Sequence, residues 1–152
     1  MAKCNPNCLT DFKSMNRRKT RFVIWSLDKE TLEISTEYKS ARAENFLDFT
    51  KRLPDSNCRY AAYDHEFKTA DGRITSKMYF FFWTPNNASQ VNNVIYTQSL
   101  KTLRDKLIGV VNYNVAKAED IKEYLGNEWI QGKGFTAPQE EEAKSDSESD
   151  FE

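Results

Sequence analysis

A run of six bulky residues, from Met78 to Trp83, constrains the fold of this chain more than any other feature. Five of the six are aromatic, although the chain as a whole is polar, with a mean hydropathy of -0.76. A strand with one exposed face alternates apolar and polar residues, whereas an unbroken apolar run of strand length indicates burial on both faces. The run is also too short to form a helix by itself. We therefore expect a central strand that is covered by helices on both sides.

Apolar and alternating segments elsewhere in the chain predict the remaining strands. Leu32, Ile34 and Thr36 alternate with polar residues, which is typical of a strand with one face in water. Asp71-Gly72 marks the end of a hairpin between the third strand and the aromatic one. The five strands are predicted at residues 21–27, 32–37, 58–67, 74–83 and 110–115.

Two helices are predicted in the first half of the chain. The first begins at Asn5-Pro6, because asparagine is a favoured N-cap and proline fits the first helical position. It ends at the basic cluster of residues 17–19, where positive charge suits the negative end of a helix. The second covers residues 43–52 and ends before Pro54. Its inward side chains are expected to be Phe46, Leu47, Thr50 and Leu53.

Two more helices are predicted in the second half. Residues 94–108 form a longer amphipathic helix, because three leucines recur there at helical spacing, namely Leu100, Leu103 and Leu107. Gly109 suits the C-cap of this helix. The last helix is expected to end near Gly126, and it is indicated by Ile121, Tyr124 and Leu125.

These elements define one α/β (α+β) domain over residues 1–137, in which a central mixed sheet of five strands has helices on both faces. Residues 138–152 differ sharply in composition, because they are charged and almost free of apolar side chains. Such a segment buries too little apolar surface to fold, so an acidic disordered tail is expected there.

Charge is distributed unevenly along the chain. The last fourteen residues hold one base, Lys144, and seven acids, namely Glu140, Glu141, Glu142, Asp146, Glu148, Asp150 and Glu152. The rest of the chain then carries 21 basic and 16 acidic side chains, a net charge of about +5. A basic body beside an acidic tail favours an acidic partner, and actin, nucleic acid and anionic lipid all meet that description.

The polar residues indicate a binding protein rather than an enzyme. Three cysteines, Cys4, Cys8 and Cys58, are too few for a disulfide scaffold, so reduced thiols and a cytosolic or nuclear location are expected. His65 follows Asp64 on a predicted strand, where neighbouring side chains point to opposite faces and do not form a catalytic pair. The sequence contains no phosphate-binding glycine loop and no nucleophile elbow. We expect no cofactor, no metal site and no membrane-spanning segment.

Several segments match the motifs of a known family in their order and spacing. Leu53-Pro54 is followed by CRYAAYD at residues 58–64, which is similar to LP…CRYAxYD. FFFWTP at residues 80–85 is similar to F-x-W-x-P, and VIYTQS at residues 94–99 is similar to MxYASS. Over residues 4–125 the chain thus resembles the actin-depolymerising factor/cofilin family. The resemblance implies the fold of that family, a mixed sheet between helices.

The resemblance also implies an actin-binding protein of the cytoplasm and actin cytoskeleton, which binds monomers and filaments and promotes filament severing and depolymerisation. The family contacts the monomer with its extreme N-terminus and its long helix. The corresponding residues here are Ala2, Lys3, Asn92, Asn93, Val94, Thr97, Gln98, Lys101, Arg104 and Asp105. It contacts the filament with the hairpin and the last helix, which correspond to Arg73, Lys77, Glu128 and Lys133. The protein is expected to act as a monomer.

The chain departs from the family pattern in ways that bear on binding. Val91 and Asn93 stand where the family has a basic pair, and Leu100 stands where it has a lysine. Because fewer cations weaken contact with acidic partners, monomer affinity or inhibition by phosphoinositides is expected to be weaker than usual. Residues 124–134 match the family poorly, so the sequence leaves open whether the filament site is retained.

Two other functions fit parts of the sequence. Glia maturation factor-like proteins have the same fold and bind the branch-forming actin-related complex, and residues 70–76 and 127–130 are faintly similar to that group. The alternative from another class is an RNA-binding module, suggested by the basic body and the aromatic strand. Such a module needs glycines and exposed, alternating aromatics for base stacking. Residues 78–83 lack both, so nucleic acid is not expected as a partner.

Overall fold

The computed structural model describes residues 2–69 and 71–132, with side chains up to Leu125. These residues form a six-stranded sheet and four helices. In chain order the elements are β1 (Lys3–Cys4), α1 (Pro6–Asn16), β2 (Phe22–Leu27), β3 (Glu33–Lys39), α2 (Phe46–Lys51), β4 (Arg59–Lys68), β5 (Ile74–Trp83), α3 (Gln90–Arg104), β6 (Val110–Val115) and α4 (Ala118–Gly132).

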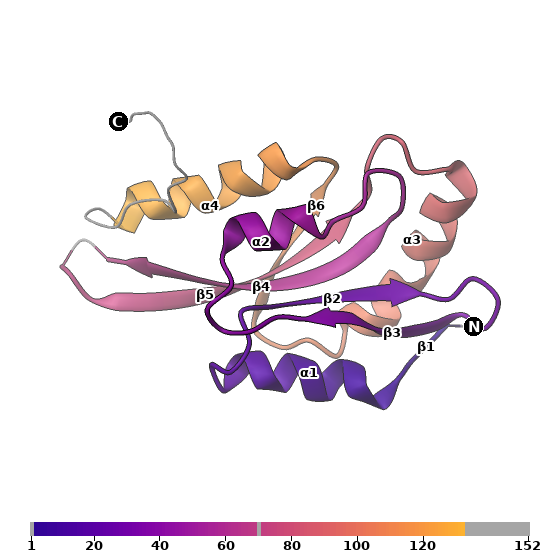
Figure 1. The fold of residues 1–152 in the computed structure, drawn as a ribbon, viewed down its shortest axis with the longest axis horizontal. Helices are drawn as coiled ribbons and strands as arrows, with labels where there is room; N and C mark the ends of the chain where they lie inside the picture. Colours follow the sequence, from indigo (N-terminus) through magenta and orange to yellow (C-terminus); the bar gives the residue numbers. More distant parts are fainter. Residues whose placement is uncertain (1, 70, 133–152) are drawn as a thin grey trace.

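The strands follow the order β1-β3-β2-β4-β5-β6 across the sheet (Figure 1). β2 pairs antiparallel with β3 and β4, and β4 pairs antiparallel with β5. β1 and β6 lie parallel to β3 and β5 at the two edges. The expected mixed sheet is therefore confirmed, with one strand more than the five predicted. The extra strand, β1, exists because Lys3 and Cys4 lie beside Glu33 and Ile34, a contact between distant parts of the chain.

Helices cover both faces of the sheet, with α2 and α4 on one face and α1 and α3 on the other (Figure 1). Along β5, Tyr79, Phe81 and Trp83 pack with α2 and α4. Phe80 and Phe82 point the opposite way and pack with α1 and α3. All five side chains are buried. The prediction that the aromatic run is a central strand covered on both sides is confirmed.

α2 turns a different face toward the core from the one that the sequence predicts. The side chain of Asn45 accepts a hydrogen bond from the backbone of Asp48, and the side chain of Asp48 accepts one from the backbone of Asn45. This capping box fixes where the first turn begins, and it directs Phe46 and Phe49 into the core. The prediction that Leu47 points inward is wrong, because that side chain is 47% exposed.

The long helix lies earlier in the chain than the predicted range of 94–108. α3 begins after Ser89, whose side chain accepts a hydrogen bond from the backbone of the first turn, and it ends at Arg104. Gly109 is therefore not its C-cap. Gly109 lies in the turn that enters β6, with a φ of +85° that favours glycine.

α4 extends further than the sequence predicts, since it continues to Gly132 and contains Gly126 in its interior. The predicted end of the domain at residue 137 and the acidic tail at residues 138–152 lie outside the described residues. None of the helices in the described ranges is both long enough and apolar enough to span a lipid bilayer.

Candidate functional site

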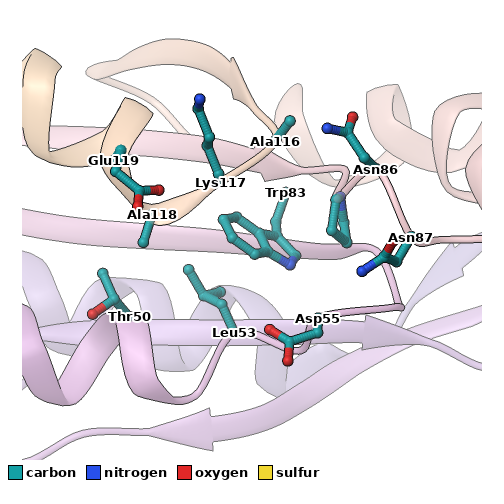
Figure 2. A pocket seen from close by; sticks show the side chains of 11 residues that line it. Thr50, Leu53, Asp55, Trp83, Asn86, Asn87, Ala116, Lys117, Ala118 and Glu119 are labelled. Carbon is teal, nitrogen blue, oxygen red and sulfur yellow. The ribbon is translucent and has the colours of Figure 1, made fainter.

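A pocket of about 430 Å³ opens between α2, the β5–α3 loop and the start of α4 (Figure 2). The indole of Trp83 lies at its centre and donates a hydrogen bond from Nε1 to the carbonyl oxygen of Pro54 at 2.7 Å. Polar side chains around it come from Thr50, Asp55, Asn86, Asn87, Lys117 and Glu119. None of the predicted actin-contacting residues that the structure describes lines this pocket, so the candidate site lies elsewhere.

The outward face of α3 carries most of the residues that were predicted to contact the monomer. Exposed positions recur at helical spacing along this helix and continue just beyond its end, so they form one stripe on the surface. The stripe, called the α3 stripe below, consists of Val91, Val94, Thr97, Gln98, Lys101 and Asp105. Within it, Lys101 Nζ lies 3.0 Å from Asp105 Oδ2 in a solvent-exposed ion pair. Asn93 and Arg104, which flank the stripe, are half-buried.

Asn92 differs from the other predicted contact residues because its side chain is buried. Its Oδ1 accepts a hydrogen bond from the backbone N–H of Cys58 at 2.7 Å. Next to it, Asn93 Oδ1 accepts one from the Cys58 thiol at 3.0 Å. A buried N–H without a partner is costly, so these two amides fix the first half of α3 against the start of β4. Asn92 therefore positions the helix and does not face outward.

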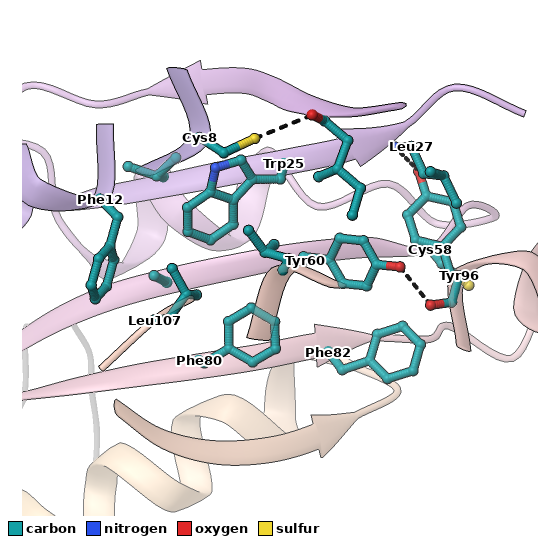
Figure 3. Close-up of a cluster of buried hydrophobic side chains, with 14 of the residues drawn as sticks. Cys8, Phe12, Trp25, Leu27, Cys58, Tyr60, Phe80, Phe82, Tyr96 and Leu107 are labelled. Carbon is teal, nitrogen blue, oxygen red and sulfur yellow. Dashed lines mark hydrogen bonds between the residues drawn. The ribbon is translucent and has the colours of Figure 1, made fainter. Parts of the chain in front are cut away.

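Two buried tyrosines hold the middle of α3 (Figure 3). The hydroxyl of Tyr96 accepts a hydrogen bond from the backbone N–H of Leu27 at 2.9 Å. The hydroxyl of Tyr60 donates to the carbonyl oxygen of Tyr96. Burial raises the pKa of both hydroxyls, so both remain protonated at neutral pH. These contacts tie α3 to β2 and β4 at the same time.

The sequence analysis missed these anchors because polar residues interrupt the buried stripe of α3. The predicted stripe ran through three leucines, whereas the buried residues of the helix are Asn92, Tyr96, Ser99 and Leu103. These four residues recur at helical spacing. That spacing would have identified them in the sequence if polar residues had been considered as core positions.

The N-terminal strand lies against α3. The thiol of Cys4 donates a weak hydrogen bond to the carbonyl oxygen of Thr102 at 3.6 Å. The backbone N–H of Lys3 donates to the carbonyl oxygen of Leu32 at 3.0 Å, which holds β1 beside β3. The side chain of Lys3 is exposed and that of Ala2 is half-buried. Two segments that are distant in the sequence, and that were both predicted to contact the monomer, are thus adjacent in the fold.

The predicted filament residues Arg73 and Lys77 are exposed on the β4–β5 hairpin. Arg73 Nε lies 2.9 Å from Asp71 Oδ2. A hydrogen bond from Thr69, followed by that from Arg73, lowers the pKa of Asp71 to about 2. The side chain of Glu128 and all of Lys133 lie outside the described part of the chain. The structure therefore places only the hairpin half of the predicted filament surface.

A network of charged side chains fixes the base of the hairpin to the rest of the fold. The buried carboxylate of Asp64 lies 2.7 Å from Arg42 Nη1. Further along β4, Glu66 pairs with Arg18 and Arg21, each at 3.0 Å. Since these arginines come from the end of α1, the start of β2 and the β3–α2 connection, the hairpin leaves the sheet from a rigid base.

The one histidine of the chain lies in the core rather than on a surface. His65 is buried, and its ring stacks on the rings of Tyr63 and Phe67. Burial lowers the pKa of His65 to about 3, and the positive charges of Arg21 and Lys77 act in the same direction. The imidazole is therefore neutral at physiological pH. Within residues 2–69 and 71–132, no group of three or more His, Cys, Asp or Glu side chains is arranged to hold a metal ion.

Comparison with known proteins identifies the family of the chain. Residues 1–133 match the family described as cofilin/tropomyosin-type actin-binding protein. The chain is 35% identical over 107 residues to actin-depolymerizing factor 9 of Oryza sativa subsp. japonica, and this match covers 70% of this chain and 77% of that protein. It is 35% identical over 102 residues to actin-depolymerizing factor 6 of Arabidopsis thaliana, and that match covers 66% of this chain and 70% of the relative. The crystal structure of Streptomyces griseoflavus cofilin matches with a TM-score of 0.76 and 25% identity, over 84% of this chain and 96% of that one.

The chain belongs to the cofilin/tropomyosin-type family of actin-binding proteins. This membership confirms the resemblance seen in the sequence, and it confirms an actin-binding protein rather than an enzyme. The likeness to the glia maturation factor of Caenorhabditis elegans, with a TM-score of 0.62 and 18% identity, is one of fold alone. β5 does not provide a base-stacking surface, because its aromatic side chains are buried on both faces.

Proposed function

We propose that this protein binds both actin monomers and actin filaments, and that it promotes filament severing and depolymerisation. The observation that carries the proposal is the α3 stripe lying beside β1 on a chain of the cofilin family. The names of its relatives, actin-depolymerizing factors of rice and Arabidopsis, support the depolymerising activity.

The monomer surface combines β1 with the α3 stripe. Its exposed and half-buried side chains include hydrogen-bonding, charged and apolar groups. They belong to Ala2, Lys3, Asn93, Val94, Thr97, Gln98, Lys101, Arg104 and Asp105, with Asn92 holding the helix from beneath. Because α3 is fixed to β2 and β4 before any partner arrives, little ordering of its backbone is lost on binding. A preformed helix of this kind suits a cleft on one actin subunit.

The proposed filament surface is the β4–β5 hairpin, through Arg73 and Lys77, together with Glu128 of α4 and with Lys133, which lies outside the described residues. β5 runs from this hairpin into the core that supports α3, so it holds both surfaces on one rigid body. α3 would enter a cleft on one actin subunit while the hairpin touches a neighbouring subunit. If the protein binds a twisted filament better than a normal one, it shifts filaments toward the twisted state. Severing would then occur where twisted and normal segments meet.

The same surface chemistry supports weak binding to phosphoinositides. Lys101 carries a positive charge on the α3 stripe, but it is paired with Asp105. Fewer free cations lower the attraction to an anionic headgroup. We propose a monomeric protein that acts at the actin cytoskeleton of the cytoplasm, with no nucleic acid as a partner.

A charge-reversal pair tests the proposal. Lys101→Glu reverses a charge on the α3 stripe, and Lys51→Glu makes the same change on α2, which covers the opposite face of the sheet. Both lysines are exposed, so neither change is expected to disturb folding. Actin affinity of Lys101→Glu should fall about tenfold or more, whereas that of Lys51→Glu should stay within about twofold of the wild type.

Co-sedimentation with actin filaments over a concentration series provides the readout, with actin followed in pellet and supernatant. Protein in the pellet together with a modest shift of actin to the supernatant supports binding to both forms. Actin in the supernatant without this protein in the pellet would restrict the function to monomers. No response in either fraction, with binding to the branch-forming actin-related complex instead, would refute the proposal in favour of a glia maturation factor-like function.

A further inference from the structure

Cys4 and Cys8 lie together at the junction of β1, α1 and β3. Cys4 is the register partner of Ile34 across the parallel β1–β3 pair. The thiol of Cys8 donates to the carbonyl oxygen of the same Ile34 at 3.2 Å. Between them, the backbone N–H of Asn5 donates to that carbonyl at 2.7 Å, and its side chain caps α1. The turn from β1 into α1 thus places both cysteines at Ile34.

The three thiols of the protein differ in their reactivity. The neighbouring thiol of Cys8 lowers the pKa of Cys4, and the positive charge of Lys106 acts in the same direction. The neighbouring Cys4 raises the pKa of Cys8, as does burial. Cys58 is buried, and burial raises its pKa to about 11. Because the thiolate is the nucleophile, we expect the partly exposed Cys4 to react first.

A buried hydrogen-bond donor, the indole N–H of Trp25, lies beside the sulfur of Cys8. The indole N–H of Trp25 has no hydrogen-bond partner among the described residues. Figure 3 shows the indole nitrogen on the side of the ring that faces Cys8. This N–H group would stabilise negative charge on the Cys8 sulfur as it becomes the attacking group.

We propose that Cys4 and Cys8 form a peroxide-sensitive dithiol that closes to a disulfide. The Cys4 thiolate attacks one oxygen of a hydroperoxide, which forms an S–O bond, breaks the O–O bond and releases the other oxygen as hydroxide or alkoxide. The Cys8 sulfur then attacks the Cys4 sulfur, which forms the S–S bond and breaks the S–O bond. The displaced oxygen leaves as water with the Cys8 proton. Two thiols are oxidised and one hydroperoxide is reduced.

The disulfide would act on the surface that we propose for actin, and this consequence rests on the proposed function. Oxidation removes the S–H groups that donate to the carbonyls of Thr102 and Ile34. The first of these contacts joins β1 to α3. Without it, Lys3 and the α3 stripe no longer keep their relative positions. The oxidised protein should therefore bind actin monomers more weakly than the reduced one.

Peptide mapping of the full chain after hydrogen peroxide treatment tests the dithiol directly. Trypsin cleaves after Lys3 and Lys13, so one peptide, residues 4–13, contains both cysteines. This peptide should lose about two mass units, and dithiothreitol should restore them. The Cys58→Ser variant should behave like the wild type, whereas Cys4→Ser and Cys8→Ser should not lose the two units. Oxygen addition to the peptide without this loss, or a disulfide that includes Cys58, would overturn the proposal.

Monomer affinity measured on the oxidised and reduced protein tests the consequence. The Kd of the wild type and of Cys58→Ser should rise about tenfold on oxidation, and that of Cys4→Ser should stay constant. Loss of two mass units with an unchanged Kd would overturn the effect on actin. If even the reduced protein binds no actin, the proposed function fails, and the mass measurement still decides the dithiol.

Discussion

Tyr96 and Tyr60 provide a matched test of how α3 is held in place. Tyr96→Phe removes the hydroxyl that accepts the N–H of Leu27. The last pair between β2 and β4 is Trp25 with Tyr60, so β4 supplies no alternative partner for Leu27. In the variant, the backbone N–H of Leu27 is therefore buried without a hydrogen-bond acceptor. A buried donor without a partner lowers the free energy of unfolding by about 2 kcal/mol.

Tyr60→Phe removes the same chemical group from an equally buried ring, but it leaves a different partner behind. The carbonyl oxygen of Tyr96 lies inside α3 and keeps its helical hydrogen bond. The expected loss is about 1 kcal/mol, the net value of one hydrogen bond. Comparing the two variants therefore separates the free-energy cost of a buried N–H without a partner from the net free energy of one lost hydrogen bond.

Equilibrium unfolding in urea measures both losses, and an unchanged m-value shows that the unfolding transition is the same. For a chain of this size the melting temperature should fall by about 4–8 °C in Tyr96→Phe and by about half of that in Tyr60→Phe. A Tyr60→Phe variant that is as unstable as Tyr96→Phe would refute the argument that the orphaned N–H of Leu27 dominates.

Three further predictions concern stability. Arg42→Ala should cost about 3 kcal/mol in urea unfolding, because it leaves the buried carboxylate of Asp64 without its cation; a loss below about 1 kcal/mol would contradict this. Gly109→Ala should cost about 1 kcal/mol, since its φ of +85° strains an L-residue although the added Cβ meets open space; an unchanged melting temperature would argue against it. His65 has a pKa of about 3 when folded and 6.5 ordinarily. The unfolded chain therefore binds the proton first, and stability falls as pH drops below 6.5, by about 2 kcal/mol at pH 5. The free energy of unfolding of His65→Gln should lack this dependence on pH.

Local patterns in the sequence were sufficient for most of the fold. Residues 79–83 form an unbroken apolar run, and only a strand buried on both faces accommodates one of that length. Asn5-Pro6 marks the start of α1, because N-cap and first-turn preferences act on neighbouring residues. Asp71-Gly72 marks the hairpin for a similar reason, since Gly72 adopts a φ of +90°. In each case the physical cause lies within a few residues of the signal.

Contacts between distant segments determined the rest. β1 exists only because residues 3–4 reach β3, and two residues carry no strand pattern of their own. Asn92 and Tyr96 are anchors because Cys58 and Leu27 present N–H groups that no strand satisfies, which becomes visible only when the sheet is assembled. The candidate site follows the same rule. The family motifs predicted which residues contact the actin monomer, whereas the packing of β1 against α3 brings the two segments that carry those residues together.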